Sequence, residues 1–146
     1  MNRYLLDVNT LLALLDPRHV FHEAAHQWAE RAPDVRWLTC PLVQNGVMRV
    51  ASQSAYPNRL GTARAVREVL QAFCADPRHE FCADDISLLD AAHLARPDLL
   101  TPSRVTDLYL LALAPGASSD LRPTHPRRGR PRRPCCDRLD RRVTGY

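Results

Sequence analysis

The stretch that decides the fold covers residues 4–15 and reads Tyr4-Leu5-Leu6-Asp7-Val8-Asn9-Thr10-Leu11-Leu12-Ala13-Leu14-Leu15. A short apolar run precedes Asp7 and predicts a buried strand over residues 3–6. A longer apolar run follows it and predicts a helix over residues 9–15, which ends where Asp16 and Pro17 interrupt the pattern. A strand that leads directly into a helix indicates an α/β protein, and in such proteins ligands bind beyond the carboxyl ends of the strands.

The chain continues to alternate between strand-like and helix-like segments up to residue 114. We expect strands at residues 35–40 and 80–83, and helices at residues 22–31, 41–51, 62–75 and 105–114. The last helix is apolar almost all round, so we expect it to be buried, and the acids within residues 84–89 predict a further helix start. This alternation predicts a parallel sheet with helices on both faces. One more strand should follow residue 114, and none is visible.

Composition divides the chain into two parts. Residues 1–114 carry 11 Arg and 13 acidic residues, whereas residues 115–146 carry nine Arg, three Asp and five Pro. The second part has one aromatic residue and no Ile, Phe, Met or Trp, so it cannot bury a core and is predicted to be disordered. We therefore expect one domain over residues 1–114 and an Arg/Pro-rich tail over residues 115–146.

The same composition argues against several classes of protein. No apolar run approaches the roughly 18 residues that a membrane span needs, and the N-terminal run lacks the pattern of a secretory signal. The five cysteines are odd in number and lack the spacing of metal ligands, which argues against a disulfide framework. We expect a cytoplasmic protein with no membrane partner.

Two acids stand out because each begins an apolar helix. Asp7 opens the helix at residues 9–15 and Asp107 opens the one at residues 105–114, which suggests a shared cation. Each acid could equally be a helix cap, because Asp favours that position. His22 and His26 lie one helical turn apart and could bind zinc, but no third ligand has a matching spacing. A solvent-exposed helix face is the alternative for that pair.

Five blocks of the chain carry a family resemblance. They begin at Leu5, Thr39, Asp76, Asp84 and Val105 and read LLDVNTLL, TCPLVQNGVMRV, DPRHEF, DDISLLD and VTDLYLLALA. In this order they resemble the PIN-domain ribonuclease toxins of the VapC type. The resemblance implies an α/β/α sandwich around a parallel sheet and an endoribonuclease that depends on Mg²⁺ or Mn²⁺. It also implies an RNA substrate, a cognate antitoxin that blocks the site, and toxin homodimers within the toxin–antitoxin complex.

The resemblance assigns roles to particular residues. Family catalysis rests on a cluster of acids, of which Asp7 matches the first and Asp107 the third. Asn9 matches the small polar residue that supports the first acid, and Thr106 precedes the third as it does in the family. Magnesium prefers carboxylate oxygens, and a bound cation can activate water and stabilise the charge on a scissile phosphate. Asp7 and Asp107 are therefore the predicted catalytic and metal-binding residues.

The chain departs from the family pattern at two acids. The second acid is a Glu in the family and Gln44 here, a change that keeps the shape of the side chain and removes its charge. The fourth should end a short apolar strand soon after residue 114, and the residues there do not match. Asp140 lies much further along the chain and is a distant candidate for a metal ligand. Gln44 is thus a degenerate catalytic position, and we expect metal binding or turnover to be weakened.

Three functions remain open on the sequence alone. The first is an endoribonuclease toxin with impaired activity, and the second is an inactive remnant that still binds the antitoxin. The third takes the tail as an Arg-rich arm that binds nucleic acid, with an affinity that falls steeply with salt. A solvated extension without function is the simpler interpretation of that tail.

The abrupt change of composition after residue 114 motivates a hypothesis about the gene. A Pro-rich tail whose basic residues are all Arg is typical of a GC-rich gene read out of frame, so we interpret residues 115–146 as a frameshifted C-terminus. Translation of the locus in the other two frames should reveal a short apolar strand that ends in Asp. If neither frame encodes such a strand, the hypothesis is wrong.

Overall fold

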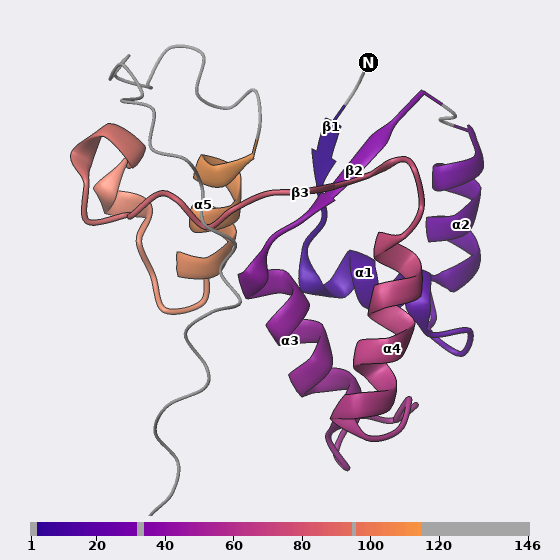
Figure 1. Ribbon diagram of the computed structural model, residues 1–146. Coiled ribbons are helices and arrows are strands. Elements are labelled where there is room, and N and C mark those ends of the chain that lie inside the picture. The colour runs from indigo at the N-terminus through magenta and orange to yellow at the C-terminus, as the bar shows by residue number, and fades with distance from the viewer. Residues whose placement is uncertain (1–2, 32–33, 95, 115–146) are drawn as a thin grey trace, which may run out of the picture.

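The computed structural model describes residues 3–31, 34–94 and 96–114, and all structural statements concern these residues (Figure 1). The expected loss of a last strand, the predicted disorder of the tail and Asp140 all lie outside them. Helices and strands alternate along the described chain, in the order β1 (Arg3–Leu5), α1 (Val8–Leu15), α2 (His22–Arg31), β2 (Arg36–Thr39), α3 (Pro41–Ser52), α4 (Ala63–Cys74), β3 (His79–Phe81), two 3₁₀ turns (Ala91–His93 and Pro97–Leu99) and α5 (Val105–Leu113).

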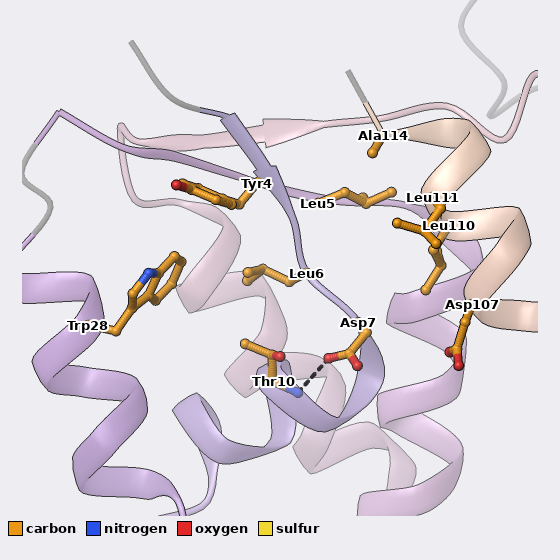
Figure 2. Close-up of a pocket in the computed structure, with 10 residues that line it drawn as sticks. All are labelled: Tyr4, Leu5, Leu6, Asp7, Thr10, Trp28, Asp107, Leu110, Leu111 and Ala114. Atoms are coloured by element: carbon orange, nitrogen blue, oxygen red, sulfur yellow. Dashed lines mark hydrogen bonds between the residues drawn. The ribbon is translucent and has the colours of Figure 1, made fainter. Parts of the chain in front are cut away.

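The sheet has three strands in the described residues, in the order β1-β2-β3, and both pairs are parallel. Tyr4 is in register with Trp37, and Trp37 with His79. Both pictures place β1 between α2 and α5 (Figures 1 and 2). The predicted α/β class and parallel sheet are confirmed, and the carboxyl ends of the strands meet at one edge.

The core forms because each helix turns an apolar stripe toward the sheet. In α4, Val66 and Leu70 are buried one turn apart, while Arg64 and Glu68 on the opposite side form an exposed ion pair. The apolar helix α1 is buried along most of its length. Side chains from β2, α1, α3, α4 and α5 meet in the centre, and the fully buried ones include Leu11, Leu38, Val43, Val47, Val66 and Leu113.

A glycine allows α3 to approach the start of α1. A Cβ atom added at Gly46 would lie 2.6 Å from Cγ2 of Val8, which is closer than any side chain tolerates. Val8 is the first residue of α1 and follows Asp7 directly. The close contact therefore fixes α3 against the turn from which Asp7 projects.

A buried carboxylate holds the other end of α1. Asp16 has an exposed fraction of 0 %, and its Oδ2 accepts hydrogen bonds from the Tyr56 hydroxyl at 2.7 Å and from Asn58 Nδ2 at 2.9 Å. Its Oδ1 accepts from the backbone N–H of Arg18 at 2.9 Å. Burial alone would raise the pKa of Asp16, but these hydrogen bonds outweigh burial and hold the pKa below its usual value. These hydrogen bonds satisfy the charge of Asp16, and those from Tyr56 and Asn58 join the end of α1 to the loop between α3 and α4.

Two histidines from α2 bond the last carbonyls of α1. Nδ1 of His22 donates to the Ala13 carbonyl at 2.8 Å, and Nε2 of His26 donates to the Leu14 carbonyl at 2.9 Å. Carbonyls at a helix C-terminus lack partners within the helix, so these contacts satisfy them. The described residues place no third metal ligand beside this pair, so they do not form the zinc site that the spacing allowed.

Three expectations about local structure are wrong. The strand at the N-terminus is not buried, because Arg3 and Tyr4 are exposed on an edge strand and only the following Leu6 is buried. Residues 84–89 form no helix, and the Asp84 carboxylate instead accepts a hydrogen bond at 3.1 Å from the backbone N–H of Leu42, in the first turn of α3. Helix α5 is buried on one side only, since Leu111 is 63 % exposed.

We predict that Asp16→Asn destabilises the protein by about 1–3 kcal/mol at neutral pH, because an amide in this place leaves buried donors unsatisfied. The folded-state pKa of Asp16 lies below that of the unfolded chain, so its contribution is present at neutral pH. That contribution is lost as the pH falls from the ordinary value of 3.8 through the folded-state pKa. Denaturant unfolding at neutral and acid pH measures both effects.

The exposed Glu23 on α2 offers a matched control for this experiment. Glu23→Gln also removes one negative charge, and it should change the free energy of unfolding by no more than about 0.5 kcal/mol. Equal stability of the Asp16→Asn variant and the wild type at neutral pH would contradict the role given to Asp16.

Candidate acidic site at the carboxyl edge of the sheet

Asp7 caps α1 and is one of two acids at this edge. It follows β1, and its Oδ1 accepts a hydrogen bond from the backbone N–H of Thr10 at 2.7 Å. The alternative of a helix cap is therefore confirmed for this residue. The cap uses one carboxylate oxygen and fixes the orientation of the group, and the second oxygen remains available to a ligand. Asp7 is half-buried, so a ligand can reach it.

Asp107 comes from the opposite end of the described chain. It lies in the first turn of α5, where Arg104 and not Asp107 occupies the N-cap position, so Asp107 is not the N-cap residue. Its side chain is exposed, as is that of Thr106 before it. A carboxylate in the first turn is favoured by the helix dipole, and this one remains open to solvent.

The structure brings Asp7 and Asp107 to one open pocket of about 530 Å³ (Figure 2). The strand β1 forms its floor, with α2 on one side and α5 on the other. Apolar and aromatic side chains provide most of the remaining lining, and the further lining residues are Tyr4, Leu5, Leu6, Thr10, Trp28, Leu110, Leu111 and Ala114. No Arg or His lies among these residues, so the two acids supply the charge of the pocket as far as the structure describes it.

Other predicted site residues lie elsewhere. Asn9 is exposed and lines a separate pocket beside the loop that carries Val20 and Phe21. Neither Thr106 nor Gln44 is among the residues that line the acidic pocket. The resemblance thus implied a cluster that contains Asp7 and Asp107, while the sequence could not place the side chains of the supporting positions.

Gln44 takes part in a polar cluster between β2, α4 and β3. Its Nε2 donates to Oγ1 of Thr39 at 2.9 Å, and the same Oγ1 lies 2.8 Å from Nε2 of His79. Because the amide nitrogen can only donate, the hydroxyl proton of Thr39 is free to be donated to a neutral His79. Burial lowers the pKa of His79 and favours that neutral form. Gln44 therefore links α3 to the sheet.

Sequence reasoning missed the role of Asp84. It follows β3 at the same edge, accepts a backbone N–H from the first turn of α3 and faces the hydroxyl of Tyr109 on α5. Burial, and after it the Asp84 carboxylate, raise the pKa of Tyr109 to about 12. Burial likewise raises the pKa of the Cys40 thiol to about 11, so that thiol is no nucleophile at neutral pH. An acid directly after a predicted strand was the signal that could have identified Asp84.

The donor set at the pocket suits a hard divalent cation. Magnesium is usually held by one or two carboxylates and keeps several waters, which is what two acids on an open pocket allow. No group of three His, Cys, Asp or Glu side chains that could hold a metal occurs in residues 3–31, 34–94 and 96–114. Asp7 and Asp107 thus fit a cation that has few protein ligands, and they do not fit a closed structural zinc site.

None of the helices in the described part of the chain is long and apolar enough to cross a lipid bilayer.

The comparisons of this chain with known proteins agree with one another. Residues 4–121 match the family described as PIN domain. Ribonuclease VapC44 of Mycobacterium tuberculosis is 45 % identical over 112 residues, which cover 77 % of this chain and 78 % of that protein. Ribonuclease VapC38 of the same organism is 40 % identical over 111 residues, which cover 75 % of this chain and 76 % of that protein. No solved structure matches the chain significantly.

We predict that Gln44→Glu raises the pKa of His79. A carboxylate at this position accepts the Thr39 hydroxyl proton, which turns the Thr39 oxygen into an acceptor for a protonated His79. An NMR titration of the His79 ring measures the change. Gln71→Glu, on the exposed side of α4, is the matched control and should leave the ring unaffected. An unchanged pKa of His79 in Gln44→Glu would contradict the hydrogen-bond direction given above.

Proposed function

We propose a function from one premise: the chain belongs to the PIN-domain family and is of the VapC type. We propose that it is an endoribonuclease that depends on Mg²⁺ or Mn²⁺ and acts as the toxin of a type II toxin–antitoxin system. Its partners are then an RNA substrate and a cognate antitoxin, and the homodimer that the resemblance implies is part of the same proposal.

One observation carries this proposal. Asp7 and Asp107 lie far apart in the sequence, and both line the pocket beyond the carboxyl end of β1. This edge is where ligands bind in α/β proteins. Two carboxylates on one pocket offer the hard oxygen ligands that a divalent cation such as Mg²⁺ prefers.

The residues of the pocket would share the work of hydrolysis. Asp7 and Asp107 would hold the cation, which when bound supplies positive charge beside the scissile phosphate and makes a bound water more acidic. The Thr10 N–H fixes the Asp7 carboxylate through the bond of 2.7 Å, so that its other oxygen keeps one direction. Hydrolysis by a water that a bound cation makes more acidic requires no nucleophilic side chain.

A second candidate is a catalytically inactive protein that still binds its antitoxin. The observation that favours it is the short list of acids: in the described residues, only Asp7 and Asp107 line the pocket. The Gln44 amide adds no charge and is occupied by Thr39. We therefore propose weakened cation binding relative to a site with more carboxylates, and cleavage that needs a high concentration of Mg²⁺.

We predict that the purified chain cleaves single-stranded RNA in the presence of Mg²⁺ or Mn²⁺ and not in EDTA. Asp7→Asn and Asp107→Asn should each lower the rate by about 100-fold or more, because each removes half of the charge that holds the cation. A gel assay with end-labelled RNA follows the reaction, and calorimetry follows Mg²⁺ binding by the same proteins.

Glu23→Gln is again the control, because it removes an exposed negative charge outside the pocket. Its rate and its Mg²⁺ affinity should equal those of the wild type. Cleavage that survives in Asp7→Asn would refute the proposed site. Absence of cleavage in the wild type, together with tight antitoxin binding, would favour the inactive protein.

A further inference from the structure

The pocket that holds the two acids is aromatic at its opposite end. Figure 2 shows Asp7 and Asp107 at the end where α1 begins, and the rings of Tyr4 and Trp28 at the other, between β1 and α2. The described lining includes no Arg, so the pocket offers a nucleic acid no cationic side chain for its phosphates. Among the described lining residues, the aromatic rings are the groups that suit a nucleobase.

Tyr4 and Trp28 form an edge-to-face pair. Their ring centroids are 5.5 Å apart and their planes make an angle of 81°. Tyr4 is 43 % exposed, and it is not among the residues that pack against the hydrophobic core, whereas Trp28 is half-buried and does pack there. Trp28 thus supports a pair of which Tyr4 is the more exposed member among the described residues.

The spacing along the chain suits one nucleotide. Leu5 and Leu6 separate Tyr4 from Asp7, so the two positions are three residue steps apart, which span at most about 10 Å at about 3.3 Å per residue. Tyr4 and the two acids thus lie close enough to contact the base and the phosphate of one nucleotide. Aromatic side chains are common platforms for the splayed bases of single-stranded RNA.

We propose that Tyr4 and Trp28 form a nucleobase-binding subsite next to the acid pair. The proposal rests on the proposed function, because it names the part of an RNA substrate that this pocket holds. Stacking uses the π-face that every base has, so the subsite selects unpaired nucleotides and places one of them, with little preference for base identity. Tyr4 is then a positioning residue for the substrate.

NMR on the full chain tests the subsite without metal and without catalysis. The chain has two tryptophans, so its indole N–H groups give two signals, and the buried Trp37 serves as an internal reference. Adenosine should move the Trp28 signal and leave the Trp37 signal in place, whereas ribose, which lacks the base, should move neither. A Trp28 signal that adenosine leaves unchanged, or that ribose alone moves, would overturn the proposal.

Variants add a kinetic test. Tyr4→Ala should abolish the adenosine-dependent shift of Trp28 and raise KM for RNA by about fivefold to 150-fold, with a smaller change in kcat. Tyr4→Phe retains the ring and should retain both properties. Phe21→Ala is the control, because Phe21 is 63 % exposed and lines a different pocket. An unchanged KM in Tyr4→Ala would overturn the subsite.

The two proposals fail in different ways. A chain that binds adenosine at Trp28 but cleaves no RNA in Mg²⁺ keeps the subsite and loses the nuclease function. A chain that cleaves RNA equally well with and without the Tyr4 ring keeps the nuclease function and loses the subsite. Binding of an apolar extended peptide at Trp28, with no response to adenosine, would assign the pocket to a protein partner instead.

Discussion

The buried carboxylate of Asp16 is the constraint on which the arrangement of this protein depends. A charge without solvent contact is tolerated only when hydrogen bonds satisfy it, and here the donors come from the Arg18 backbone and from Tyr56 and Asn58 in the loop after α3. The last carbonyls of α1 are bonded by His22 and His26 of α2. The C-terminal end of α1 is thus fixed by two other segments. Because α1 is a short and mostly buried helix, its first turn is fixed as well, and Asp7 projects from that turn.

This arrangement explains how far the sequence could predict the structure. Periodicity and end signals predicted α2 over its full length and the start of α3 at Pro41, because those signals are local. The partners of Asp16 lie about forty positions away, and no local pattern connects them. The contact between Gly46 and Val8 is of the same kind. Long-range pairs of this sort fix the angles between helices, and spacing along a single chain does not encode them.

The same distinction applies to the candidate site. The family resemblance implied that Asp7 and Asp107 belong to one cluster of acids, and both line one pocket, while their catalytic and metal-binding roles stay predictions. The direction of the Gln44 side chain could not be predicted, because it depends on a hydroxyl on β2 and an imidazole on β3. A charged residue at this position would meet the same neighbours. The size and charge of the Gln44 side chain therefore describe only part of its chemistry. Its hydrogen-bond partners determine the rest.

The side chains of Asp7 and Asp107 are constrained to different extents by the contacts around them. This difference affects how the pocket can bind a cation. Asp7 is fixed by its own cap and by the anchored helix α1. Asp107 is exposed on α5, which is attached through Leu110 and Leu113 on its inner side and through Tyr109 facing Asp84. A change in the angle of α5 would move Asp107 relative to Asp7, and it would alter the opening beside Tyr4 and Trp28 at the same time. The contacts of α5 with Asp84 and the core thus set both the separation of the acids and the width of the pocket.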